Sequence, residues 1–454
     1  MKTPTGSPEI VLPSARIRSL DEYALRGGLV GLQRARSIGP DAVIAEISAS
    51  GLRGRGGAGF PAGTKWRSVR DAGAPTFVVV NGAEGEPGTF KDRAIMRSDP
   101  FQVVEGALIA AFAVGADAVV VATKAKYALE RRAMARAINE FVAAGLTQVP
   151  VDLFAGPDSY LFGEEKALLE AIEGNEPMPR ILPPFQYGLF AGGAQLGWSA
   201  RESRGDGDNP TVVNNVETMA NGPHILANGA DWYRSFGTPD SPGTVVCTVV
   251  GDVVSPVVVE LEMGTPLDVA LRRAGGVRAG RAVKAVLNGV ANAVLGPEHL
   301  DIGLDHRSLD AVGSGLGAAG FAVYDEDARM MSVAASVAEF LAVGSCGQCL
   351  PCKVGGTHVA ETLRSLAVGS VDPTELNQLC LRLQQLPDGS RCYLPTQHQK
   401  VVTSILQRFT DDLELHLAGV GCGRQERGVP RLRTVGNGHA VLERVRSGVA
   451  PGRR

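Results

Sequence analysis

The sequence GLRGRGGAGFPAGTKW, from Gly51 to Trp66, decides the fold. Glycine lacks a Cβ and opens positive φ, so a loop this rich in glycine allows its backbone to approach a ligand closely. Its two arginines and one lysine favour an anionic ligand such as a phosphate. A flexible linker is the alternative, but linkers are usually rich in Gly and Ser and lack aromatic residues such as Phe60.

Gly54, Gly56 and Gly59 match the dinucleotide fingerprint G-x-G-x-x-G. That fingerprint requires a strand immediately before the turn and a helix after it. Residues 40–50 instead begin with proline and carry apolar residues at helical spacing, which predicts a helix. The loop is therefore not an ordinary Rossmann phosphate loop.

The composition is that of a globular protein, with 454 residues, 44% hydrophobic and 20% charged, and a formal net charge of −3. Nothing in this balance points to nucleic acid, and no apolar run is long enough for direct membrane insertion. The first fifteen residues lack the features of a signal peptide. We therefore expect a cytoplasmic protein whose seven cysteines are ligands rather than disulfides.

Strands and helices alternate after the glycine loop. A buried strand over 76–80 ends in the turn Asn81-Gly-Ala-Glu84-Gly-Glu86, and later segments alternate in the same way. We expect helices over 100–114 and 126–144, strands over 118–122 and 151–155, and a helix from about 163 to 174. This order predicts an α/β fold with a mostly parallel sheet, in which the Asn81 turn and the glycine loop face one site.

Two pairs of polar residues in this region have open interpretations. Glu164 and Glu165 begin a helix, where they can simply favour the positive end of its dipole. Asn214 and Asn215 offer amides suited to a heteroaromatic ring or a polyol, but can equally cap a helix. Residues 187–209, rich in Gly and polar residues, predict an exposed loop.

The carboxyl-terminal half changes character at about residue 243. Valine-rich strands and one helix over 243–326 predict a compact β-grasp-like unit, and four helices are expected over 333–341, 353–365, 373–385 and 396–409. The predicted organisation is a flexible amino terminus (1–18), an α/β domain (19–242), the β-grasp unit (243–326), a helical unit (327–417) and a Gly/Arg-rich tail (418–454). Because the tail has little apolar content, we expect it to be disordered or a contact arm for an acidic partner.

Cys346, Cys349 and Cys352 form the run C-x-x-C-x-x-C, the strongest chemical signal in the chain. Three thiolates in one loop are typical of an iron–sulfur cubane, whereas zinc sites usually pair two separated knuckles. Cys392 is chosen as the fourth ligand because it follows a polar turn, while Cys380 has the spacing of a helical core residue. Cys247 and Cys422 are expected to have no ligand role.

These motifs occur together in one order, and the chain from about Leu20 to Leu417 resembles the NADH-binding flavoprotein subunit of respiratory complex I. It is also similar to the corresponding subunits of NAD-dependent hydrogenases and formate dehydrogenases. The resemblance implies FMN, one [4Fe-4S] cluster and NAD(H). It also implies a Rossmann-like flavin domain, a ubiquitin-like SLBB domain and a carboxyl-terminal four-helix bundle that carries the cluster.

The resemblance assigns roles to residues that match the motifs of the family. The flavin cradle would comprise Gly54, Arg55, Gly56, Gly57, Lys65, Asn81, Glu84, Asn214, Asn215 and Thr218. In that cradle Arg55 and Lys65 would balance the phosphate charge. Phe60 and Phe185 resemble residues that stack on adenine, and Glu86 and Glu165 resemble the acidic residues near the nicotinamide nucleotide.

Three positions depart from the family pattern where flavin or NADH would bind. Ala83 replaces an aspartate, Ser68 replaces an aromatic residue and Leu182 replaces a lysine. The predicted function is transfer of a hydride from NADH to FMN and of single electrons through the cluster to a partner. That partner would be a ferredoxin-like or thioredoxin-like [2Fe-2S] subunit of a larger redox complex. The alternatives are an electron relay that does not bind NADH, and a scaffold with a structural cluster.

Overall fold

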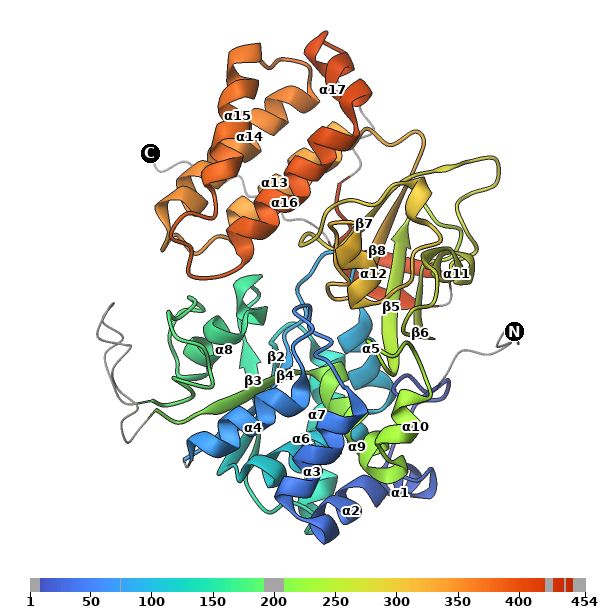
Figure 1. Cartoon of the computed structure of the whole chain (residues 1–454), viewed down its shortest axis with the longest axis vertical. Coiled ribbons are helices and arrows are strands. Elements are labelled where there is room, and N and C mark those ends of the chain that lie inside the picture. Colours follow the sequence, from blue (N-terminus) through green and yellow to red (C-terminus); the bar gives the residue numbers. More distant parts are fainter. Residues whose placement is uncertain (1–8, 74, 192–207, 421–427, 437, 444–454) are drawn as a thin grey trace.

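The computed structural model describes residues 9–73, 75–191, 208–420, 428–436 and 438–443. In Figure 1 an α/β domain lies at the bottom, a helical region lies at the top, and a second sheet lies beside the junction between them. The two sheets and the helical region correspond to successive parts of the chain.

The α/β domain is built on a parallel four-stranded sheet with strand order β3-β2-β1-β4. The strands are β1 (Phe77–Gly82), β2 (Ala118–Lys124), β3 (Val151–Gly156) and β4 (Thr211–Asn215). Val79 lies opposite Val120 on one side and Val213 on the other. The predicted α/β fold with a parallel sheet is confirmed, and β1 lies at the point where the strand order reverses, which is where ligands bind in such sheets.

Helices cover both faces of this sheet. Val78 and Val80 point into the larger core and Val79 points into the smaller one, as the period of two in a strand requires. The helices of this domain are α1 (Leu20–Leu25), α2 (Val30–Ile38), α3 (Pro40–Ser50), α4 (Ala62–Ala72), α5 (Lys91–Ser98), α6 (Pro100–Val114), α7 (Ala128–Ala143), α8 (Glu165–Ile172), α9 (Val216–Asn228) and α10 (Ala230–Arg234). The glycine loop connects α3 to α4, so the helix expected over 40–50 is confirmed.

The second sheet is mixed, with order β6-β5-β8-β7. Its central strand β5 pairs antiparallel with β6 and parallel with β8, and β7 pairs antiparallel with β8. The elements are β5 (Thr244–Gly251), β6 (Val257–Glu262), α11 (Leu267–Arg273), β7 (Val283–Asn288), α12 (His306–Ala311) and β8 (Gly320–Asp325). Cys247 is fully buried in β5, as expected of a cysteine without a ligand role.

The helical region contains one helix more than the sequence predicts. Its helices are α13 (Met330–Gly344), α14 (Gly356–Ala367), α15 (Pro373–Gln385), α16 (Leu394–Arg408) and α17 (Thr410–Leu417). A π-helical turn, Pro351–Gly355, precedes α14 and delays its start. None of the helices in the described ranges has the length and apolar composition needed to cross a lipid bilayer.

Both terminal segments differ from the expectation of loose structure. Val11 and Ile17 are buried, and the amides of Val11 and Leu12 donate to the Glu260 carboxylate at 3.0 and 2.9 Å. In the tail, β9 (Leu432–Gly436) and β10 (His439–Leu442) form an antiparallel hairpin, whose Leu432 is buried. The prediction of flexibility or disorder is therefore wrong for residues 9–18, 428–436 and 438–443. Residues 1–8 and most of the predicted loop 187–209 lie outside the described residues.

Candidate functional site

The glycine loop is held open by its own backbone and by one side chain. Gly54 N donates to Phe60 O at 2.9 Å, and Arg53 Nε donates to Gly59 O at 2.7 Å. Gly59 has φ +63°, and a Cβ there would lie 2.4 Å from Cε1 of His306. Only glycine therefore fits this position, for reasons of both backbone conformation and space.

The Arg55 guanidinium is not available to a phosphate. Its side chain is 1% exposed, and it donates to Tyr233 Oη, Pro242 O, Thr244 O and Arg53 O at 3.0–3.1 Å. The expectation that this side chain balances phosphate charge is therefore not met. The guanidinium instead binds the loop to Tyr233 in α10 and to Pro242 and Thr244, which follow that helix.

The backbone of the same loop does offer donors. In the described part of the chain, the amides of Gly56, Gly57 and Ala58 donate no hydrogen bond, while the neighbouring Arg55 N donates to Thr218 Oγ1 at 2.9 Å. Gly57 has φ +131°, and the space that its Cβ would occupy is empty. Successive free amides in a glycine turn form an anion-binding concavity, so this loop fits the phosphate of FMN.

The predicted polar residues of the cradle converge at the carboxyl ends of β1 and β4. Asn81 Nδ2 donates to Gly163 O at 2.8 Å, and Asn214 Oδ1 accepts from Trp66 Nε1 at 2.8 Å. Asn215 caps α9, since its Oδ1 accepts from Glu217 N at 3.0 Å. The capping alternative for the asparagine pair is thus correct for Asn215, and its side chain still borders Gly56.

A buried charge network beneath the cradle was not predicted. Lys91 Nζ contacts Asp92 Oδ1 at 2.7 Å, Glu217 Oε2 at 2.9 Å and Asn215 Oδ1 at 3.0 Å. Asn215 Nδ2 in turn donates to Asp92 Oδ2 at 2.7 Å. Burial favours a lower pKa for Lys91, but the charges of Asp92 and Glu217 outweigh it and raise the pKa. The sequence signal was the charged run Lys91-Asp92-Arg93 directly after an apolar Phe90.

Glu84 lies against the same network. Its Oε2 accepts from Arg93 Nε at 2.8 Å and its Oε1 accepts from Asp92 N at 3.2 Å. Its carbonyl accepts from the Tyr127 hydroxyl. Glu84 is only 8% exposed, so its carboxylate is fixed by α5 rather than by solvent.

The opposite side of the site carries the acidic residues expected near NADH. Lys65 Nζ pairs with Glu165 Oε2 at 3.0 Å and donates to Val213 O at 3.1 Å. Glu86 accepts from Tyr160 Oη at 2.6 Å, and burial raises the pKa of Glu86. Glu164 caps α8, since its Oε2 accepts from Ala167 N at 2.9 Å, and burial raises its pKa to about 7. The helix-end interpretation is therefore correct for Glu164, whereas Glu165 reaches the site.

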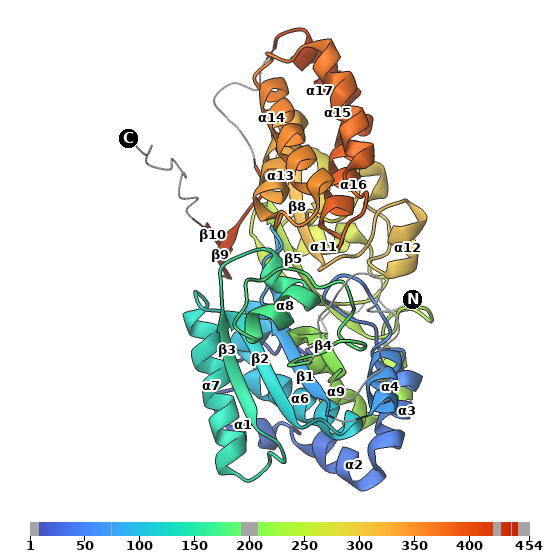
Figure 2. The same ribbon diagram turned by 90° about the vertical axis from the view of Figure 1, so that its left-hand side faces the viewer.

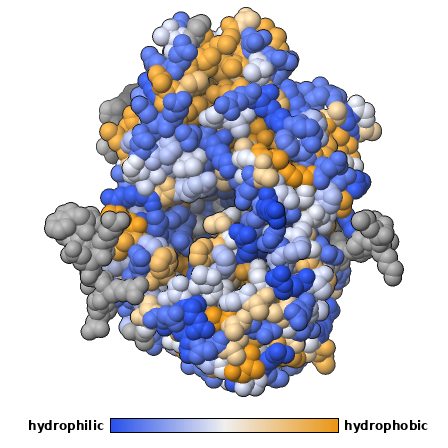
Figure 3. Space-filling model, viewed as in Figure 1, coloured by the Kyte–Doolittle hydropathy of each residue, from blue (hydrophilic) through white to orange (hydrophobic). Residues whose placement is uncertain are grey.

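Phe60 and Phe185 are the exposed part of the site, at 50% and 41% of their surface. Ser68, where the family has an aromatic residue, is also exposed and donates to Thr64 O at 3.0 Å. Leu182 is partly exposed, and Ala83 is buried in the smaller core together with residues of α8. In Figure 3 the surface is hollowed between the α/β domain and the helical region, with hydrophilic residues around the hollow.

The four predicted cysteine ligands belong to one core cluster of the helical region, where Cys352 is buried and the other three are partly exposed. Ser345 Oγ lies 3.2 Å from Cys352 Sγ, and Gln348 Nε2 donates to Cys346 Sγ at 3.5 Å. Cys380 is exposed on α15, so the expectation that it is a core residue is wrong, and Cys422 lies outside the described residues.

The cysteine set suits a cluster that neutralises several thiolates. Burial, with smaller contributions from the charges of Glu164, Cys346 and Cys352, raises the pKa of Cys392 to about 12. Thiolates around one zinc would lie about 3.8 Å apart. Across the described ranges, no three His, Cys, Asp or Glu side chains converge in the manner of ligands to a single ion. A cubane carries each thiolate on a different iron, so its four ligands need not converge on a single ion.

The flavin-side residues and the cysteine loop are joined directly. Lys166, in the first turn of α8, donates to Arg391 O beside Cys392. Gln348, between Cys346 and Cys349, donates to Pro179 O at 3.2 Å, and Tyr160 Oη, which donates to Glu86, also contacts Gln397 Oε1 at 3.2 Å. The two candidate cofactor sites therefore meet at the start of α8.

Comparisons with known proteins agree with this arrangement. A family model described as the Nuo51 FMN-binding domain matches residues 47–224, which include the glycine loop and Thr218. A second, described as the NADH-ubiquinone oxidoreductase-F iron-sulfur binding region, matches residues 332–416, which include all four cysteines. The predicted FMN and [4Fe-4S] cofactors are confirmed at this level.

Relatives and solved structures extend the similarity along the chain. The F 2 subunit of NADH-quinone oxidoreductase from Rhizobium meliloti (strain 1021) is 36% identical over 418 residues, which cover 89% of this chain and 95% of that protein. The F subunit of the same enzyme from Streptomyces coelicolor is 34% identical over 417 residues, covering 89% of each. A crystal structure of NAD+-reducing [NiFe]-hydrogenase in the H2-reduced state superposes with a TM-score of 0.75 at 32% identity, covering 88% of this chain and 67% of the hydrogenase chain. The chain therefore belongs to the family of NADH-quinone oxidoreductase F subunits.

Proposed function

We propose that this chain takes electrons from NADH and passes them to a partner protein through bound FMN and a [4Fe-4S] cluster. The observation that carries the proposal is the direct contact between the two sites at the start of α8, where Glu165 reaches Lys65 while Lys166 reaches Arg391. Bound FMN would supply the exchange between hydride and single-electron transfer that such a route requires.

In this proposal the residues of the chain bind and orient FMN and the dinucleotide. The amides of Gly56, Gly57 and Ala58 hold the phosphate, with Lys65 as the nearby cation. Because the Lys65–Glu165 pair is partly exposed, at 20% and 39% of the side chains, an incoming phosphate can replace Glu165 as the partner of Lys65. Glu165 is then free to accept hydrogen bonds from the dinucleotide.

The remaining residues divide between the two ligands. Gly54, the backbone of Arg55, Asn81, Glu84, Asn214, Asn215 and Thr218 complete the flavin cradle. Phe60 and Phe185 stack on the adenine, and Glu86, held by Tyr160, meets the nicotinamide side. Cys346, Cys349, Cys352 and Cys392 hold the cluster.

The finer domain assignments are part of the proposal. We infer that residues 19–242 form the Rossmann-like flavin domain, residues 243–326 the ubiquitin-like SLBB domain and residues 327–417 a four-helix bundle with α17 as an addition. The mixed sheet with α11 and α12 supports the second assignment. The cytoplasmic location stays a prediction.

The electron acceptor is proposed to be a [2Fe-2S] subunit that docks over the cysteine loop. Leu350 and Tyr393, which adjoin the ligands Cys349 and Cys392, are 73% and 55% exposed. Exposed apolar residues in such a place are typical of a protein interface. A larger redox complex would bury them.

The test is anaerobic mixing of the reconstituted full chain with NADH while flavin absorbance is followed. We expect the flavin band to bleach, and dithionite to bleach it in a control with the same cluster content. A flavin that dithionite reduces and NADH does not would favour the relay alternative, and titration with NADPH and a non-nicotinamide donor would then identify the donor. No flavin absorbance after FMN supplementation would favour the scaffold with a structural cluster.

A further inference from the structure

The C-terminal hairpin, defined here as residues 428–436 and 438–443, lies beyond both regions that the family models match. Figure 2 shows β9 and β10 at the level where the lower domain meets the upper parts of the molecule. The hairpin follows the last helix, so neither cofactor motif includes any part of it.

The C-terminal hairpin contacts all three parts of the chain. Gly88 N, in the turn after β1, donates to Pro430 O at 2.8 Å. Tyr324 Oη on β8 donates to Gly428 O at 3.2 Å, and Val429 N donates to Ser336 Oγ on α13 at 3.1 Å. The hairpin therefore lies where the three parts meet and forms a hydrogen bond with each of them.

One of its contacts leads directly to the flavin cradle. Arg93 Nη1 donates to Leu432 O at 2.6 Å, while Nε of the same guanidinium donates to Glu84 Oε2 at 2.8 Å and Nη2 donates to Thr89 O at 2.7 Å. The guanidinium also lies 4.2 Å from the centre of the Phe90 ring. Nε, Nη1 and Nη2 of the planar guanidinium thus each donate to an acceptor. The Leu432 carbonyl thereby fixes the orientation in which Arg93 contacts Glu84.

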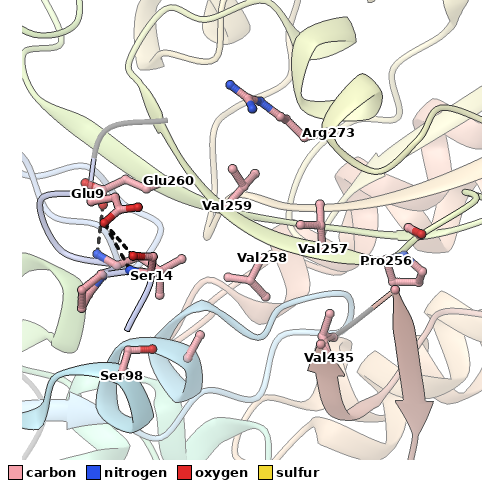
Figure 4. A pocket seen from close by; sticks show the side chains of 16 residues that line it. Glu9, Ser14, Ser98, Pro256, Val257, Val258, Val259, Glu260, Arg273 and Val435 are labelled. Carbon is pink, nitrogen blue, oxygen red and sulfur yellow. Dashed lines mark hydrogen bonds between the residues drawn. The ribbon is translucent and has the colours of Figure 1, made fainter. Parts of the chain in front are cut away.

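The other flank of the hairpin is packed less closely. Val435, Gly436 and Gly438 border a cavity of about 430 Å³, together with β6 and residues near Glu9. Figure 4 shows Val435 on one side of this cavity and Val257 and Val258 on the other. The hairpin is held both by its polar contacts toward α5 and by the burial of Leu432 in the core.

We propose that the C-terminal hairpin is a positioning element of the flavin site, acting through Arg93 on Glu84. Without the hairpin, one buried guanidinium donor loses its acceptor, and the fork is free to turn away from Glu84. The carboxylate of Glu84 then loses its fixed direction at the cradle. This inference rests on the proposed FMN site, and concerns a segment to which no cofactor role has been assigned.

The test is FMN titration of the full chain and of a chain that ends at Arg427. Quenching of flavin fluorescence measures the binding. We expect FMN to bind the shortened chain about 10- to 100-fold more weakly, the range for one hydrogen bond to a charged group. Arg93→Lys, which cannot bridge Leu432 and Glu84 as a fork, should cause a similar loss. Combining the two changes should weaken binding no further, because both act through one contact.

Arg97→Gln is the matched control, because Arg97 contacts the hairpin through Thr434 Oγ1 at 3.3 Å and pairs with Glu130 rather than Glu84. It should lower the melting temperature and leave FMN affinity within about twofold. If the shortened chain fails to fold, a protease site placed within 421–427 releases the hairpin from protein that is already folded. Unchanged FMN affinity after release or truncation overturns the inference. An intact chain that binds no FMN overturns the proposed function itself, before any residue is changed.

Discussion

The inner wall of the flavin site and its outer rim are built in opposite ways. On the wall, Lys91, Asp92 and Glu217 are at most 5% exposed and bind one another and Asn215. On the rim, Phe60 and Phe185 are about half exposed, and Ser68 makes only a local hydrogen bond to its own helix.

This difference explains where the chain departs from its family. A buried charge that loses its partner is costly, so a change on the wall requires compensating changes in several elements. A change on the rim costs little in stability and acts on ligand binding alone. Ser68 and Leu182, two of the three departures, lie on the exposed side, while the third, Ala83, is a small buried residue that leaves no charge unpaired.

Lys91→Met should have the largest effect. It leaves Asp92 and Glu217 buried without their shared cation, which should lower the free energy of unfolding by about 3–5 kcal/mol. Denaturant unfolding measures this loss. Arg67→Met is the control, because Arg67 pairs with Asp41 on the surface and its loss should lower the free energy of unfolding far less. Equal losses in the two variants would remove the distinction between wall and rim.

Asp92→Asn should change how stability depends on pH. Burial, opposed by the charge of Lys91, raises the pKa of Asp92 from 3.8 to about 6. Between these values the folded chain retains a proton that the unfolded chain has released, so the contribution of Asp92 to stability falls as pH rises through this window and is constant above it. Asp92→Asn should remove the part of the pH dependence of stability that Asp92 contributes. The changed hydrogen bonds should also lower the free energy of unfolding, by an amount that does not vary with pH.

Asp41→Asn should change the pH dependence of stability in the opposite direction. The hydrogen bond from Arg67 lowers the pKa of Asp41, so this group stabilises the fold above its unfolded pKa and loses that contribution as pH falls. Denaturant midpoints measured at about pH 4 and about pH 7 for both variants separate the two behaviours. Identical slopes in the two variants would contradict the assigned shift of Asp92.

Leu182→Lys and Ser68→Phe should have the smallest effects on stability. Each introduces the residue type that the resemblance to the family implies, and should tighten NADH binding by about tenfold for the cation and about fivefold for the ring. The free energy of unfolding should change by less than about 0.5 kcal/mol. Equilibrium titration with NADH measures the affinity, with Leu182→Met as the uncharged control. Unchanged NADH affinity would mean that these side chains do not face the dinucleotide.

Local patterns were sufficient for much of the fold and for the presence of an iron–sulfur cluster. Apolar strands alternating with helical spacing predicted the parallel sheet, and the cysteine run predicted the cluster, because both signals lie within short stretches. The helix before the glycine loop was predicted from Pro40 and the spacing of the apolar residues that follow it.

Contacts between distant residues could not be predicted in this way. Nothing in the loop distinguishes a buried Arg55 from a partly exposed Lys65, since the burial of Arg55 depends on Tyr233 and Thr244. The Lys91 network requires Asn215 and Glu217, more than 120 residues later in the chain. The hairpin was missed because its strands are short and its contacts, the buried Leu432 and the polar contacts with α5, are made with residues far away in the chain.

The hydrogen bonds and contacts that shape the glycine loop also bear on when FMN can bind during synthesis of the chain. The loop depends on Thr218, on the carbonyls of Pro242 and Thr244, and on the ring of His306, all of which leave the ribosome well after Trp66. A nascent chain that has extruded only the flavin-domain sequence therefore lacks Thr244 and His306, two of the groups that shape the loop. We expect cofactor insertion to be complete only after the second sheet has been translated and has folded against the first.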